Sequence, residues 1–201
     1  MDTNQIIALI MPIVLLAIMY PIFQLLSRKF GNQAGWFWGL VTYWLIWGIV
    51  FSFALVGKET IINLVRPQKF TFQAVTFTAI PIIFAAIGRI FMGIKYEKAS
   101  VWIWLGLLVT AVGNGLFEEI LWRGTYLALF PGSILFQIIW PSVWFGIWHY
   151  VPGSVSSRGN VRGLMVGAIF LGLFLSLLAK QTDTIWWSIL GHTLAGIVMV
   201  T

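Results

Sequence analysis

Long apolar runs dominate this sequence, and they restrict what the chain can fold into more than any other feature. A helix needs about 20 apolar residues to cross a bilayer, and lipid leaves no other way to satisfy the backbone hydrogen bonds of such a run. The ten-residue alternation of a membrane β-barrel is absent from the sequence. The apolar runs cover residues 6–26, 36–56, 70–92, 101–117 or beyond, 134–151, 161–179 and 185–201. We therefore predict an all-α, polytopic transmembrane helix bundle of about seven to eight spans.

Composition points the same way and excludes a soluble domain. Hydrophobic residues make up 60% of the 201 residues and charged residues only 9%, whereas a soluble domain carries about 25% charged residues. Seven spans take about 140 residues, so no sizeable extramembrane domain fits. We predict one integral membrane domain over residues 1–201.

The net charge of +6 does not indicate a nucleic-acid partner, because no stretch of the chain is densely basic. Basic residues in short loops are typical of membrane interfaces, so we expect lipid as the partner of these side chains. The chain has no cysteine, which excludes disulfides, thiolate metal sites and a cysteine nucleophile.

The distribution of Lys and Arg between the loops predicts an orientation in the membrane. The loops after the first, third and fifth runs hold six basic residues, and those after the second, fourth and sixth hold four. The six are Arg28, Lys29, Lys95, Lys98, Arg158 and Arg162, and the four are Lys58, Arg66, Lys69 and Lys180. This bias favours an outside N-terminus and a cytoplasmic C-terminus.

Five ionisable residues in or beside the apolar runs cannot be assigned to loops or, like Arg89, to the membrane interface, and such groups deep in lipid are costly and usually functional. They are Glu118, Glu119, Arg123, His149 and His192. Glu119 and Arg123 are four residues apart with the acid first, the favourable order for a salt bridge on a helix. Glu118 points about 100° away from Glu119 on a helix, so it is free to face a cavity.

Two neutral residues share faces with this group. Asn114 lies one turn before Glu118, and Phe145 lies one turn before His149. A carboxylate and two imidazoles inside the bilayer can deprotonate a water and stabilise an oxyanion, and the same set is also common in catalytic zinc sites. The structural alternative is a buried ion pair with histidines that only bond across helices. A proton relay or transporter is least favoured, because the two halves of the sequence show no symmetry.

Three motifs within residues 101–201 resemble those of a known family. Residues 118–123 fit E-E-x-x-x-R, residues 145–149 fit F-x-x-x-H, and His192 opens a third motif, H-x-x-x-N/D. Their order and spacing are similar to those of the CAAX prenyl protease and bacteriocin-processing family, abbreviated CPBP or called Abi. The resemblance implies an intramembrane glutamic endopeptidase with a conical cavity inside the membrane.

The resemblance also implies roles for individual residues. In the family the first glutamate activates the hydrolytic water, which corresponds to Glu118 here. The histidine of the second motif assists that water, which corresponds to His149. The histidine of the third motif contributes to the oxyanion hole, which corresponds to His192. The expected supporting residues are Glu119, Arg123, Phe145 and Asn114.

Substrates and cofactors follow from the same resemblance. Eukaryotic members remove the last three residues of isoprenylated CAAX proteins, and prokaryotic members act on other peptides. The implied substrate is a peptide or a prenylated protein C-terminus, and the implied location is a prokaryotic cell membrane. No cofactor is expected, because the family favours a metal-independent glutamate mechanism over a zinc one.

One position departs from the family pattern. Gly196 stands where the third motif has Asn or Asp, so one oxyanion donor is missing. Loss of one such donor typically costs about 10²–10³ in kcat. Asn114 or Thr193 is a candidate replacement. The alternative is a weak or inactive family member that serves as a membrane immunity or scaffold protein.

Glu118 and His149 can form one site only if they lie at the same depth in the membrane. Glu118 lies about 25 Å along a helix that starts near residue 101, and His149 lies near the far end of the next run. Antiparallel neighbours would place the two side chains at different depths. They meet only if the fourth span continues towards Phe130 or if Pro141 bends the fifth.

Overall fold

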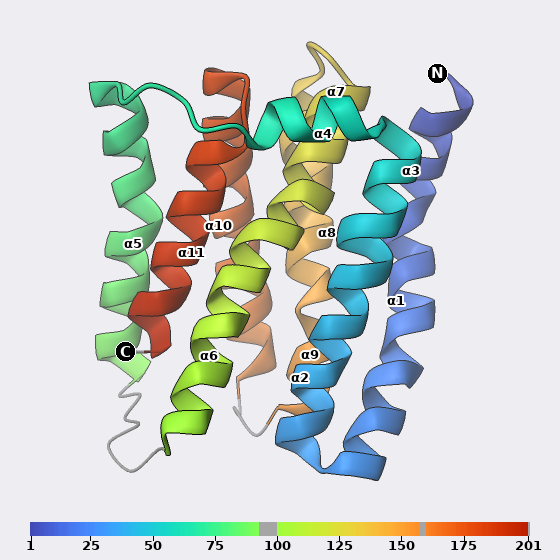
Figure 1. The fold of residues 1–201 in the computed structure, drawn as a ribbon, viewed down its shortest axis with the longest axis vertical. Coiled ribbons are helices and arrows are strands. Elements are labelled where there is room, and N and C mark those ends of the chain that lie inside the picture. The colour runs from blue at the N-terminus through green and yellow to red at the C-terminus, as the bar shows by residue number, and fades with distance from the viewer. Residues whose placement is uncertain (93–99, 157–159, 201) are drawn as a thin grey trace.

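The computed structural model describes residues 1–92, 100–156 and 160–200, and this part of the chain is helical without any strand. The predicted all-α bundle is confirmed. Figure 1 shows long helices standing side by side, with the N-terminus at one end of the bundle and the C-terminus towards the other. An odd number of crossings places the two termini on opposite sides of the membrane, and the positions of the termini agree with such a number. The sidedness of the chain stays a prediction, and Lys95, Lys98 and Arg158, on which it partly depends, lie outside the described residues.

Some of the helices contain wider π-helical segments between their regular α segments, and these carry the label η. The N-terminal half contains α1 (Thr3–Phe30), α2 (Asn32–Tyr43), η1 (Trp44–Phe51), α3 (Ser52–Val56), α4 (Lys58–Val65) and α5 (Phe72–Met92). The C-terminal half contains α6 (Val101–Gly113), η2 (Asn114–Glu118), η3 (Ile120–Gly124), α7 (Thr125–Leu129), η4 (Leu135–Ile139), α8 (Trp140–Trp148), α9 (Tyr150–Val155), α10 (Val161–Thr182) and α11 (Trp186–Val200).

Five helices are long and apolar enough to cross a membrane. They are Thr3–Phe30, Asn32–Val56, Phe72–Ile90, Val101–Leu129 and Val161–Thr182. The two remaining apolar runs of the sequence form the broken segment η4–α8–α9 and the shorter helix α11. Five of the seven predicted spans therefore have the length of a crossing, and the total of seven to eight stays a prediction.

The sequence contains one helix that we did not expect. Lys58–Val65 forms α4, which lies across one end of the bundle (Figure 1). Gly57, at φ 93, allows the sharp turn that leads into it. Ile61 is fully buried, and the Leu64 carbonyl accepts hydrogen bonds from Ile185 N at 3.0 Å and Thr184 Oγ1 at 2.7 Å. The helix α4 thus caps the start of α11.

The fourth span meets the geometric condition set by Glu118. It continues without interruption from Val101 to Leu129 through η2 and η3, so Glu118 lies well inside it. The extra width of a π-helical turn is common at functional sites, and Glu118 and Arg123 both lie in such turns.

The helix of the following segment is interrupted at His149 and runs on through Pro141, just after η4 gives way to α8. Pro152 lacks the N–H that would bond to the carbonyl of Trp148, and its ring would clash with that carbonyl in a regular helix. The His149 N–H bonds instead to Gly146 O, three residues back, at 3.1 Å. The break separates α8 from α9 and places His149 at the bend.

The N-terminal helix is tied to the C-terminal half by polar contacts. The Gln5 side chain donates to Leu129 O at 2.7 Å, and the Tyr126 hydroxyl donates to Ala8 O at 2.7 Å. Buried residues of α1, α2 and α8 form one continuous hydrophobic core. The assignment of residues 1–201 to one domain stays a prediction, and these contacts are in keeping with it.

Two glycine contacts let α11 lie close to the fourth span. A Cβ at Gly115 would overlap Thr193 Oγ1 and come within 2.8 Å of the Thr193 nitrogen. A Cβ at Gly196 would lie 3.1 Å from the Cβ of Ala111. Small residues of this kind are what allows close helix approach in membranes.

We predict that Gly115→Ala lowers the thermal unfolding temperature in detergent, because overpacking a filled contact costs about 1–3 kcal/mol. The matched control is Gly106→Ala in the same span, since no atom lies within 4 Å of an added Cβ there. That control is expected to be neutral or stabilising by up to about 1 kcal/mol. Equal unfolding temperatures for the two variants would contradict the close contact of α11 with η2.

Candidate active site

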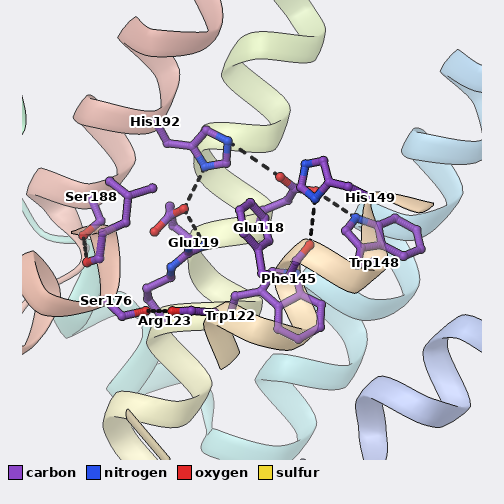
Figure 2. Close-up of polar contacts among 12 residues, drawn as sticks. Glu118, Glu119, Trp122, Arg123, Phe145, Trp148, His149, Ser176, Ser188 and His192 are labelled. Carbon is purple, nitrogen blue, oxygen red and sulfur yellow. Dashed lines mark hydrogen bonds and ion pairs between the residues drawn. The ribbon is translucent and has the colours of Figure 1, made fainter. Parts of the chain in front are cut away.

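The predicted ionisable residues come together from three separate segments. Glu118, Glu119 and Arg123 lie in and between η2 and η3, His149 follows α8, and His192 lies in α11. Figure 2 shows their side chains converging between these helices. The two glutamates, Arg123 and His192 are buried, and His149 is half-buried. The most accessible member of the group is therefore His149.

Glu119 forms the salt bridge that its spacing predicted, and it has a second partner as well. Its Oε1 accepts from Arg123 Nη1 at 2.9 Å. The same oxygen lies 2.7 Å from His192 Nδ1. Because a buried carboxylate is stable only when it is paired and hydrogen-bonded, this shared oxygen fixes the positions of Arg123 and His192 together.

His192 stands between the two glutamates. Its Nδ1 is bound to Glu119, while its Nε2 lies 3.7 Å from Glu118 Oε2. A separation of 3.7 Å is too long for a direct hydrogen bond. Glu118 Oε2 is buried and has no hydrogen-bond partner among the described residues.

Glu118 has one firm partner, which the sequence analysis missed. Trp148 Nε1 donates to Glu118 Oε1 at 3.1 Å. Trp148 is fully buried, and a buried indole N–H usually finds an acceptor. Its place directly before His149 is the signal from which this role could have been inferred.

The tautomer of His149 follows from its one hydrogen bond. Its Nδ1 lies 2.7 Å from the carbonyl oxygen of Phe145, and a carbonyl can only accept, so Nδ1 carries the proton. In the neutral ring the Nε2 atom is then a free acceptor. Among the described contacts none joins His149 directly to Glu118. The two residues are connected through the neighbouring Trp148.

Phe145 lies at the centre of the group. Its ring meets the His149 ring edge-on at 4.6 Å between centroids and the His192 ring at 5.8 Å. The Arg123 guanidinium lies over the same ring, 4.3 Å from its centroid. A cation over a desolvated ring is attracted to its face, which adds to the stability of Arg123 in the interior.

Asn114 and Thr193, the two candidate replacements for the missing donor, are held by other contacts. The Asn114 Oδ1 accepts from Trp44 Nε1 at 3.0 Å, which leaves the Asn114 amide N–H groups as the donors of that side chain. Thr193 packs its hydroxyl against Gly115. Neither residue has a described hydrogen bond to Glu118.

A cavity of about 340 Å³ lies at another place in the bundle. It is lined by residues of α4, α7, η4 and α10 and of the turns near them, including Thr60, Gln137 and Lys180, and by none of the predicted site residues. The predicted conical cavity at Glu118 therefore stays a prediction.

Comparison with known families agrees with the motifs. Residues 100–198 match the family model described as "Type II CAAX prenyl endopeptidase Rce1-like". This half of the chain belongs to the Rce1-like family. The match contains every predicted site residue, and the family is one of CAAX-type membrane proteases. No curated protein and no solved structure matches the chain.

We predict that Arg123→Met destabilises the protein by about 3–5 kcal/mol, because it removes the guanidinium paired with the buried Glu119 carboxylate and leaves only His192 beside it. The double variant Arg123→Met/Glu119→Gln is expected to recover most of that loss. Arg89→Met is the control. It removes a guanidinium that donates to Val198 O at 2.9 Å, and we expect it to cost about 1 kcal/mol. Denaturant unfolding in detergent measures the free energy of unfolding of all three variants. A double variant that is no more stable than Arg123→Met would contradict the charge pairing.

Proposed function

We propose that this chain is an intramembrane endopeptidase of the CAAX-protease type, which hydrolyses a peptide bond with a water activated by Glu118 and His149. The observation that carries the proposal is the buried meeting of two carboxylates and an imidazole inside a helix bundle, with His192 bound to Glu119 at 2.7 Å and lying 3.7 Å from Glu118. The family match supports the reaction class. The proposed substrate is a peptide or a prenylated protein C-terminus, and the proposed location is a prokaryotic cell membrane.

The charges of the buried groups favour a donor role for His192. When Glu118 is ionised, as the proposed base has to be, the two glutamates and one Arg123 guanidinium leave one negative charge unbalanced. An uncompensated charge in a low-dielectric interior is costly. A protonated His192 balances it and places an Nε2–H next to the reacting oxygen of Glu118. This N–H is the proposed hydrogen-bond donor to the oxyanion.

The proposed reaction runs in two steps. The free Oε2 of Glu118 takes one proton from a water, while the unprotonated Nε2 of His149 accepts a hydrogen bond from the water's other O–H. The water oxygen bonds to the peptide carbonyl carbon, and the carbonyl oxygen becomes an oxyanion beside His192 Nε2–H. The C–N bond then breaks, the proton on Glu118 passes to the leaving nitrogen, and a carboxyl group and an amine result. These steps use no metal ion, so metal content of the purified protein separates this mechanism from a zinc mechanism.

We predict that Glu118→Ala and His149→Ala each reduce peptide cleavage by about 10²–10⁴-fold, the usual contribution of a general acid or base. Glu59→Ala is the matched control, because Glu59 is an exposed acid on α4. Cleavage of a panel of farnesylated and unprenylated peptides in liposomes measures the effect. The proposal fails if both site variants cleave as fast as the parent protein.

One observation favours the alternative of a weak or inactive family member. Position 196, which carries Asn or Asp in the family, is Gly196 and packs against Ala111. An added Cβ would come 3.1 Å from the Ala111 Cβ, so the helix contact leaves little room for a donor there. Under the alternative the chain would bind a membrane partner, as an immunity or scaffold protein, without cleaving it.

The double variant Gly196→Asn/Ala111→Gly tests these two possibilities. Removing the Ala111 methyl group makes room for the new side chain, and we expect kcat to rise by up to about 10²-fold if an oxyanion donor is missing. The control is Gly196→Ala/Ala111→Gly, which adds bulk without an amide and should not raise kcat. An unchanged rate in the Asn variant means that another residue, such as Asn114, already supplies the donor. If neither the parent protein nor either variant cleaves any peptide, the result supports the alternative of a binding protein.

A further inference from the structure

We propose that Trp148 is a positioning residue, which holds the Glu118 carboxylate so that only Oε2 is left to accept a proton, and that Tyr43 on α2 holds Trp148 in turn. The inference rests on the proposed function and adds to it the residues that aim the base. Figure 2 shows the Trp148 indole pointing at Glu118 from the opposite side to His192.

The hydrogen bond of Trp148 decides which carboxylate oxygen is free. An indole N–H can only donate, and it donates to Glu118 Oε1 at 3.1 Å. The terminal torsion of a glutamate is broad and has no strong preference of its own, so a fixed donor sets the orientation of the group. Oε2 then faces His192 Nε2 at 3.7 Å and has no hydrogen-bond partner among the described residues.

Trp148 can serve as a fixed donor because its ring is held by two aromatic neighbours. Tyr43 stacks on it with 4.1 Å between centroids and 26° between planes. Phe23 meets it edge-on at 5.9 Å and 80°. All three rings are fully buried. The Tyr43 hydroxyl accepts from Trp122 Nε1 at 2.8 Å, which also prevents Tyr43 from turning away.

These supports come from a part of the chain outside the family match. Phe23 belongs to α1 and Tyr43 to α2, whereas the match begins at residue 100. The first two helices therefore take part in shaping the site, in addition to crossing the membrane beside it.

Trp148→Phe tests the inference, because it removes the N–H and keeps an aromatic ring against Tyr43. Loss of a hydrogen bond to a charged group corresponds to about 10–100-fold, and we expect this loss in kcat for farnesylated peptides, with KM within about threefold. The control is Trp47→Phe. Trp47 lies in the same hydrophobic core, and its buried Nε1 has no hydrogen-bond partner among the described residues, so kcat should not change.

Two further variants separate positioning from a general loss of structure. In a Glu118→Asp background the shorter carboxylate does not reach the indole, so adding Trp148→Phe should then change kcat by less than about threefold. If Trp148 had a purely structural role, Trp148→Phe would lower kcat by the same factor in the parent protein and in the Glu118→Asp background. Tyr43→Leu leaves the indole N–H and removes its stacking partner, and we expect kcat to fall by about 2–10-fold.

An infrared measurement reads the same contact without any substrate. The carboxylate band of Glu118 is identified by subtracting the spectrum of Glu118→Gln. We expect that band to shift in Trp148→Phe and to stay in place in Trp47→Phe. If the parent cleaves none of the peptides, the proposed function is rejected and the infrared band still decides whether Trp148 holds Glu118. If Glu118→Ala is inactive while Trp148→Phe matches Trp47→Phe in rate and in band position, the proposed function stands and the positioning role is overturned.

Discussion

One carboxylate oxygen organises the functional half of this protein. Glu119 Oε1 binds Arg123 at 2.9 Å and His192 at 2.7 Å, and it thereby joins the fourth span to α11. Charges buried in lipid or protein cost several kcal/mol each unless they are paired. The pairing is therefore a condition for the fold as well as for the chemistry. Neither helix can shift along the other without exposing an unpaired charge to the interior.

Much of this arrangement could be predicted from where charge occurs in the sequence. In a chain this apolar, an ionisable residue inside a run has to have a partner, and that reasoning found Glu118, Glu119, Arg123 and both histidines. The spacing of Glu119 and Arg123 also gave their salt bridge, because it depends only on helical geometry. A bend at Pro141 was one of two conditions under which Glu118 and His149 could meet, but the described break lies at His149. It follows instead from Pro152 and the carbonyl it frees at Trp148.

The parts that could not be predicted depend on contacts between distant segments. Trp148 is one of 12 tryptophans, and its place beside His149 indicates that it lies near the site but not that its indole meets the Glu118 carboxylate. The stacking of Tyr43 on Trp148 joins residues far apart in the chain. The helix α4 is short, and its strongest anchor is Ile61, buried against a surface that exists only after α11 has packed. Local sequence patterns do not show which distant residues will be in contact.

The glycine at position 196 and the short contact of His192 with Glu119 have a common physical cause. Gly115 and Gly196 remove the side chains that would hold α11 away from the fourth span, since a Cβ at either one would press on Thr193 or Ala111. His192 comes directly before Thr193 on α11 and lies 2.7 Å from Glu119. A larger residue at position 196 would push the helices apart by way of Ala111 and lengthen that bond. We therefore expect a larger polar side chain at position 196 to be compatible with this close pairing only if residue 111 is smaller than alanine.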